Sequence, residues 1–305
     1  MKRRQFLLRS LSATASMAFS PFIFSSCRPS LHGKKLTILH TNDMHSYIEP
    51  FEEGRYQGLG GMAARASIVN KIRFQEANVM LLDSGDVFQG TPYFNLFGGE
   101  LELKLMSEMG YDATTVGNHE FDNGIGGLEH AMQFANFPHL IANYDFSRNT
   151  LSGKVKPFKI FERGEIKIGV FGLGIELEGL VNSRMYDGTL YIDPIATAKE
   201  MVQELQKQGC DLIVCLSHLG YDYGDSRKPS DLILAKEVSE IDVILGGHTH
   251  TFMEEPLLLT NSEGFTTTIN QVGWAGINLG RIDVMFTEKG KKVVAFNPMP
   301  LLNKV

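Results

Sequence analysis

Short apolar runs alternate with longer amphipathic stretches along most of this chain, and the alternation predicts an α/β protein. The apolar runs favour strands, whereas the longer stretches space their apolar residues as helices do. The predicted strands are residues 36–40, 79–82, 114–116, 140–142, 158–161, 167–171, 212–216 and 243–245. The predicted helices are residues 61–74, 100–109, 126–136, 194–208 and 230–238. Residues 257–296 have an alternating pattern that indicates further strands.

Side chains that can bind metal ions stand at or just beyond the ends of five predicted strands. Two divalent ions that share one carboxylate need about seven protein ligands, which leaves open positions for water and substrate. In an extended backbone, residues two apart point to the same side, so each D-x-H or H-x-H pair is expected to aim both side chains inward. Imidazole with carboxylate oxygen favours Zn or Mn over Ca or Mg. The candidate ligands are Asp43, His45, Asp86, Asn118, His218, His248 and His250.

These runs read D-x-H, G-D, G-N-H-E, H and G-H-x-H in chain order, and they resemble the calcineurin-like metallophosphoesterase superfamily. The flanking residues are similar to those of the N-terminal catalytic domain of bacterial 5'-nucleotidases and UDP-sugar hydrolases. The resemblance covers roughly residues 35–300. It implies an α/β fold with four layers, an αββα sandwich of two mixed sheets, which is the metallophosphoesterase fold.

The resemblance also implies a role for each candidate. One ion would be held by Asp43, His45 and His250, the other by Asn118, His218 and His248, with Asp86 bridging the two. His119 and Asp122 would form a catalytic dyad. A carboxylate partner favours the imidazolium form of histidine, which suits it to stabilise transition-state charge or to protonate the leaving oxygen. The implied reaction is an in-line attack by metal-bound water or hydroxide on a phosphoryl group.

Some neighbouring residues are expected to support the site. Glu120 is expected to orient its loop rather than to react. Gly85, Gly117 and Gly247 stand beside ligands, where the chain must turn sharply or pass close to the ions. Trp274, the only tryptophan in the sequence, is open to two interpretations: a core or turn residue, or a residue that contacts substrate.

The first 27 residues have the layout of an export signal. Residues 1–26 contain four basic and no acidic side chains, with an apolar stretch at residues 11–24. The Arg3-Arg4 pair resembles a twin-arginine signal, and residues 24–27 resemble a lipoprotein cleavage box in which Cys27 becomes acylated. We therefore expect an export signal at residues 1–27, a linker at 28–35, a metallophosphoesterase domain at 36–305, and a periplasmic protein or membrane-anchored lipoprotein. The alternative is an uncleaved membrane anchor, which the short apolar stretch disfavours.

Net charge limits the choice of partner. The formal net charge of −6 becomes about −10 without residues 1–26, and an acidic protein is a poor binder of nucleic-acid polymers. An anionic substrate would then be attracted by bound cations rather than by a basic surface.

The substrate suggested by the resemblance is a 5'-nucleotide, with UDP-sugars, 2',3'-cyclic nucleotides or sulfur esters as alternatives. Relatives carry a C-terminal nucleotide-binding domain for which this sequence has no counterpart before Val305. We therefore expect either loose specificity or completion of the site by a separately encoded substrate-binding protein. A non-catalytic metal-binding or scaffold lipoprotein is the alternative from another class.

Overall fold

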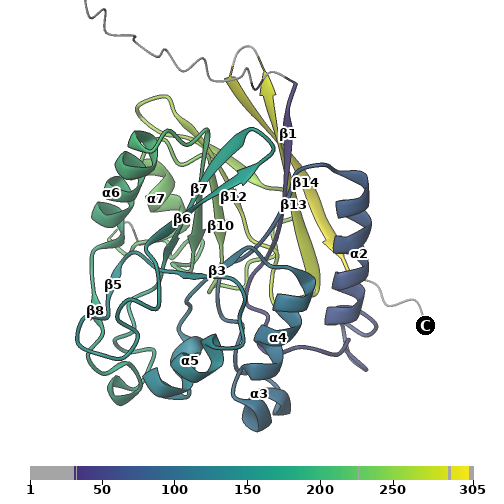
Figure 1. The fold of residues 1–305 in the computed structure, drawn as a ribbon, viewed down its shortest axis with the longest axis vertical. Coiled ribbons are helices and arrows are strands. Elements are labelled where there is room, and N and C mark those ends of the chain that lie inside the picture. The colour runs from purple at the N-terminus through teal and green to yellow at the C-terminus, as the bar shows by residue number, and fades with distance from the viewer. Residues whose placement is uncertain (1–30, 32, 226, 288–289, 302–305) are drawn as a thin grey trace, which may run out of the picture. The chain divides into compact units, whose positions relative to one another are not determined.

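Two mixed six-stranded β-sheets form the centre of the protein (Figure 1). This computed structural model describes residues 31, 33–225, 227–287 and 290–301. The strand order is β14-β13-β1-β2-β3-β4 in the first sheet and β11-β12-β10-β9-β7-β6 in the second. The first sheet consists of β1 (Lys35–Thr41), β2 (Val79–Asp83), β3 (Ala113–Thr115), β4 (His139–Leu140), β13 (Asn278–Thr287) and β14 (Gly290–Pro300). The second consists of β6 (Phe158–Arg163), β7 (Ile166–Leu173), β9 (Leu212–Ser217), β10 (Val243–Gly246), β11 (Leu257–Thr260) and β12 (Thr266–Asn270).

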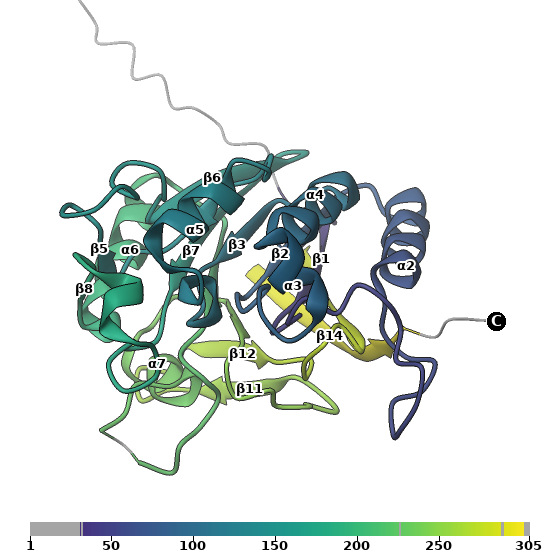
Figure 2. The ribbon, with the colours of Figure 1, turned by 90° about the horizontal axis from the view of Figure 1, so that it is seen from below.

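Helices cover the outer face of each sheet and complete the predicted four layers (Figure 2). The first sheet packs against α2 (Met62–Gln75), α3 (Pro92–Phe97), α4 (Glu100–Met109) and α5 (Gly124–Met132). The second packs against α6 (Pro194–Lys207) and α7 (Asp231–Glu237). A two-stranded sheet of β5 (Tyr144–Asp145) and β8 (Leu190–Tyr191) and the short 3-10 turns His119–Phe121 and Ser183–Tyr186 lie in the connections. The predicted α/β sandwich is confirmed.

Strand β1 shows how the alternating pattern builds these layers. Leu36 and Ile38 are fully buried in the core between the two sheets, whereas Leu39 is buried on the other face, beneath α2 and α4. Successive side chains of a strand point to opposite faces, so one strand can supply both cores. The strand therefore has an apolar residue on each of its faces.

Two helices differ from the prediction. Helix α3 was not predicted, because its six residues are too few to display helical periodicity. It begins after Thr91, whose hydroxyl accepts a hydrogen bond from the Tyr93 backbone N–H, and it ends at Gly98, which has a left-handed backbone. Helix α5 was predicted at residues 126–136 but runs from Gly124 to Met132. Strand β14, by contrast, agrees with the β pattern of the tail.

Several predictions fall on residues that the structure does not describe. The export signal at residues 1–27, including Cys27, lies outside the described residues, and so does half of the 28–35 linker, whose last residue, Lys35, opens β1. Among the described residues, no helix combines the length and the apolar character needed to cross a membrane.

Candidate metal centre

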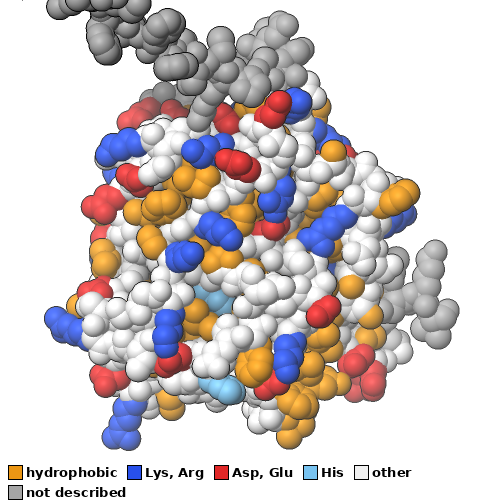
Figure 3. Space-filling view, viewed as in Figure 1, with side chains coloured by type: hydrophobic (Ala, Val, Ile, Leu, Met, Phe, Trp, Pro, Cys, Tyr) orange, Lys and Arg blue, Asp and Glu red, His pale blue; other side chains and the backbone are white. Residues whose placement is uncertain are grey.

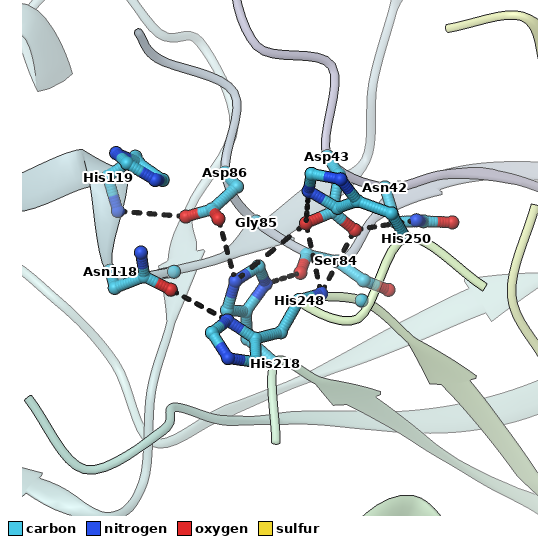
Figure 4. A network of polar contacts seen from close by, with 12 residues as sticks. Asn42, Asp43, Ser84, Gly85, Asp86, Asn118, His119, His218, His248 and His250 are labelled. Carbon is cyan, nitrogen blue, oxygen red and sulfur yellow. Dashed lines mark hydrogen bonds and ion pairs between the residues drawn. The ribbon is translucent and has the colours of Figure 1, made fainter. Parts of the chain in front are cut away.

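All seven candidate ligands converge at the carboxyl ends of parallel strands, and Figure 4 labels all of them except His45. They follow β1, β2 and β3 in the first sheet and β9 and β10 in the second. The two sheets are joined there by Ser84, whose hydroxyl donates to the Leu245 carbonyl at 2.8 Å. Loops at the carboxyl ends of parallel strands are the usual place for a binding site in α/β proteins.

The first cluster consists of Asp43, His45 and His250, and one potential ligand atom of each lies within 4.8 Å of the others. The Nε2 atoms of His45 and His250 are 2.9 Å apart, and His250 Nε2 lies 3.4 Å from Asp43 Oδ1. Two imidazole nitrogens and a carboxylate that meet in this way form a typical set of ligands for a transition-metal ion.

The second cluster consists of Asp86, His218 and His248, again within 4.8 Å of one another. Asn118 joins it, because its Oδ1 lies 2.9 Å from His248 Nδ1. The Asp86 Oδ2 lies 3.1 Å from His218 Nε2. Asp86 also forms a third group of potential ligands with His45 and His119, so that it lies between the two clusters.

The surroundings of His218 indicate whether these residues fit a cation. The ring is fully buried, and its Nδ1 lies 2.6 Å from the Ser84 carbonyl, which can only accept a hydrogen bond. In the neutral ring, Nε2 therefore carries a lone pair, and it faces the carboxylates of Asp86 and Asp43, 3.1 and 4.0 Å away, which are acceptors as well. A metal ion between them satisfies all three groups at once, and a carbonyl that fixes the other nitrogen is the common arrangement behind a histidine ligand.

The pKa values of His218 and Asp86 also indicate a site that favours a cation. Burial alone would lower the pKa of His218, but the Asp86 carboxylate beside it raises this pKa to about 10. Burial would likewise raise the pKa of Asp86, and the charge of His218 outweighs it, so that the pKa is well below its usual range. The centre thus favours a positive charge among buried carboxylates.

Five of the seven candidate ligands have a left-handed rather than an extended backbone. The φ angles are 51° at Asp43, 46° at His45, 53° at Asp86, 70° at His248 and 52° at His250. The expectation that D-x-H and H-x-H pairs aim inward from an extended strand is therefore wrong in its geometry, although both members of each pair do reach the site. Left-handed non-glycine residues are strained, and they concentrate at functional sites.

All three glycines leave space for the ligands, as expected: a Cβ on Gly247 would lie 2.9 Å from the His218 Nδ1 and 3.1 Å from the Asp43 Oδ2. A Cβ on Gly117 would lie 2.2 Å from the Asp86 Oδ1, and one on Gly85, whose φ is 84°, would lie 2.7 Å from the Gly117 nitrogen. No larger residue fits at either position without moving the Asp86 loop.

Glu120 supports the Asp86 loop through hydrogen bonds with backbone N–H groups. Its carboxylate is almost fully buried and accepts hydrogen bonds from the backbone N–H of Asp86 at 3.0 Å and of Val87 at 2.8 Å, and from Gly117 as well. Burial raises the pKa of Glu120 to about 7. These contacts hold the loop in place, in agreement with the expectation that Glu120 orients its loop.

Three further residues support the ligand loops and were not predicted. The Asn42 amide donates to the Asp43 Oδ2 at 2.6 Å and to the Gly273 carbonyl at 2.6 Å. Gln271 donates to the Gly247 carbonyl at 2.8 Å and to buried Asp231 at 3.1 Å. Asn42 directly precedes a ligand, which was a usable signal, but Gln271 and Asp231 are distant in sequence from the loop that they support.

His119 and Asp122 lie at the edge of the centre. The His119 Nδ1 is 2.8 Å from the Asp122 Oδ2, and the backbone N–H of His119 donates to the Asp86 Oδ1 at 2.8 Å. The hydrogen bond to Asp122 raises the pKa of His119 to about 8. The His119 ring contacts the His45 ring edge-on, with centroids 5.2 Å apart.

Residues 36–252 match the Calcineurin-like phosphoesterase family. The chain belongs to this family. It is 35% identical over 291 residues to a 5'-nucleotidase of Vibrio cholerae, a match that covers 88% of this chain and 52% of the relative. It is 33% identical over 299 residues to the snake venom 5'-nucleotidase of Gloydius brevicauda, covering 88% and 48%.

Solved structures agree with this assignment. A 5'-nucleotidase precursor of Thermus thermophilus superposes with a TM-score of 0.78 at 33% identity, covering 88% of this chain and 54% of the other. The NAD nucleotidase of Haemophilus influenzae gives 0.77 at 32% identity, covering 88% and 50%. The chain thus spans about half the length of each of these four proteins.

Proposed function

We propose that this protein hydrolyses phosphate esters with the help of two divalent cations and that 5'-nucleotides are its substrates. The observation that carries the proposal is the fully buried His218 ring, whose Nε2 lies between the carboxylates of Asp86 and Asp43, 3.1 and 4.0 Å away. Membership of the phosphoesterase family and relatives named 5'-nucleotidase support it.

The two clusters would hold the ions. Asp43, His45 and His250 are the proposed ligands of one ion, Asn118, His218 and His248 those of the other, and Asp86 is shared. Zn or Mn suits this mixture of imidazole and oxygen ligands. Such ions, when bound, polarise phosphoryl oxygens and make a water molecule acidic enough to serve as a nucleophile near neutral pH.

His119 and Asp122 are the proposed catalytic pair. Asp122 orients the ring through Nδ1, which leaves Nε2 of His119 for the substrate. As an imidazolium, the ring stabilises negative charge on the phosphoryl group and donates its Nε2 proton to the leaving oxygen. The hydrogen bond from the His119 backbone to Asp86 couples the position of this pair to the proposed bridging carboxylate.

Other esters are retained as alternatives. UDP-sugars, 2',3'-cyclic nucleotides and sulfur esters would use the same centre with a different group beside it. A sulfate thiohydrolase of Thermus thermophilus shares the fold at 20% identity and a TM-score of 0.72, which is evidence for the fold alone.

The partners and the location of the protein follow as proposals. We propose export to the periplasm with a lipid anchor at Cys27, and a separately encoded substrate-binding protein as a possible second component. We expect no binding to nucleic-acid polymers, because acidic and basic side chains are interspersed on the face shown in Figure 3 and the formal net charge is −6.

Product formation by the full chain tests the proposal: phosphate from AMP and from nitrophenyl phosphate, UMP and glucose 1-phosphate from UDP-glucose, and a nucleoside monophosphate from 2',3'-cyclic AMP. AMP, UDP-glucose, 2',3'-cyclic AMP and nitrophenyl phosphate should be assayed after chelation and again after addition of Zn or Mn, with an Asp86→Asn variant as the matched control. Turnover that requires metal and Asp86 is expected, with AMP as the best ester. Two bound metals without turnover of any ester would contradict it, and sulfate release from a thiosulfate ester without phosphate release would replace it by the sulfur-ester alternative.

A further inference from the structure

Five aromatic side chains from three separate segments form a continuous surface beside the first cluster. We call this surface the aromatic wall; its members are Tyr47, Phe51, Tyr56, Phe252 and Trp274. The wall is held by ring contacts: Tyr47 stacks on Phe51 with centroids 4.8 Å apart, and Trp274 meets the edges of both rings at 5.4 and 6.1 Å. Tyr56 continues it from Phe51 at 5.7 Å to Phe252 at 6.0 Å.

The wall adjoins the metal centre directly. Trp274 lies parallel to the ring of His250, with an interplanar angle of 6° and centroids 5.7 Å apart. Tyr47 and Phe252 each stand two residues after a proposed ligand, His45 and His250. A group bound at the two clusters therefore has this aromatic surface beside it.

The wall is not an extension of the hydrophobic core. None of its five rings belongs to the three buried apolar clusters of the described residues. Phe252 is 41% exposed, and the other four rings are half-buried. Packing of the sheets therefore does not account for these rings, and they present apolar surface to solvent next to the centre.

We propose that the aromatic wall binds the planar base of a nucleotide whose phosphoryl group lies at the metal centre. The inference rests on the proposed function, because it identifies what part of the substrate lies beyond the phosphoryl group. Bases stack on aromatic side chains with little dependence on sequence, since every base has a π face. An aromatic surface made of half-exposed Tyr, Phe and Trp rings fits such a group better than it fits a sugar phosphate without a base.

Trp274 allows binding to be measured without catalysis. It is the only tryptophan of the chain, so fluorescence excited selectively at tryptophan reports on the wall and on the adjoining His250. Adenosine, which has a base but no phosphate, should quench this fluorescence saturably in the full-length protein, with metal and without. Ribose 5-phosphate, which has the phosphate but no base, should not quench it in the metal-free protein. Absence of saturable quenching by adenosine would overturn the inference.

A pair of substrates gives the second readout. In Phe252→Leu, which keeps Trp274 as the reporter, the ratio of kcat/KM for AMP to that for ribose 5-phosphate should fall by about tenfold, the range expected for loss of one base–aromatic stack. Phe74→Leu is the matched control, because Phe74 is 92% exposed on α2 and outside the wall, and there the ratio should stay unchanged. Equal losses on both substrates, or an unchanged ratio in Phe252→Leu, would contradict base binding.

The two hypotheses can fail separately. If the wild-type protein hydrolyses no phosphate ester, the proposed function fails, while the adenosine titration still decides whether the wall binds a base. If AMP and ribose 5-phosphate are hydrolysed equally well and adenosine does not quench, the proposed function stands and the inference about the wall fails.

Discussion

Two fully buried histidines, His40 between the sheets and His218 at their carboxyl edge, have opposite electrostatic environments. His40 ends the apolar part of β1, and its Nε2 lies 2.9 Å from the Asn270 side-chain amide; burial lowers its pKa to about 3. The pKa of His218 is instead raised to about 10, because burial, which lowers it, is outweighed by the Asp86 carboxylate beside the ring. Burial alone makes a neutral core histidine, and buried carboxylates turn the same residue type into part of a cation site.

The largest effect should come from removing the charge of Asp86, which distinguishes the surroundings of His218 from those of His40. In Asp86→Asn, the surroundings of His218 come to resemble those of His40, and a ligand shared by both proposed ions is lost. We expect metal-dependent turnover to fall by more than the roughly 100-fold that loss of an outer-shell partner costs, with loss of bound metal as well. Metal content by elemental analysis and phosphate release would measure this.

The matched control for Asp86→Asn is Glu162→Gln, which changes an exposed carboxylate on β6. It should retain both the metal content and the rate. Full metal content and full activity in Asp86→Asn would mean that the two clusters do not share this carboxylate.

Replacing His119 should separate catalysis from metal binding. His119→Gln keeps hydrogen-bonding capacity but cannot transfer a proton, so kcat should fall by about 10²- to 10⁴-fold. The metal content should stay at the wild-type value, because His119 is not one of the proposed ligands. A normal rate in this variant would exclude the ring as the general acid.

Weakening the hydrogen bonds that Glu120 makes with the Asp86 loop should have an intermediate effect. In Glu120→Gln, one oxygen acceptor is replaced by an amide donor that faces backbone N–H groups, so the loop loses part of its support. Metal affinity should weaken by about 10- to 100-fold, as is usual for partners behind a ligand. Competition with a chelator of known affinity measures this change, and unaltered affinity would show that the loop holds its shape without the carboxylate.

The smallest effect concerns stability rather than activity. Because the folded-state pKa of His40 lies near 3 and the unfolded value near 6.5, the neutral ring is favoured in the folded protein. Stability from this source is present above pH 6.5 and is lost as pH falls toward 3, with a loss of about 2 kcal/mol at pH 5. Urea unfolding at pH 7 and pH 5 should show this loss in the wild type and a smaller one in His40→Gln, and equal losses in both proteins would count against it.

The sequence by itself determined the succession of strands and helices and the residues that end five of the strands. Apolar periodicity and the metal-binding residue types are local properties, so they could be read without a fold. On that basis, the seven candidate ligands were predicted as a group, and the structure brings them together; their assignment to two ions came from the resemblance and stays a prediction. Helix α3 was not predicted, because its six residues contain too little periodicity.

Tertiary structure alone decided how those residues act. The left-handed backbone at Asp43 and His248 comes from loops that cross between strands, and no local pattern specifies it. Gln271 and Asp231 became supports of the His248 loop only because the order of strands brings distant segments together. The same order places Trp274 against His250 and gives His40 and His218 opposite surroundings, since a histidine's charge depends on neighbours that lie far away in the sequence.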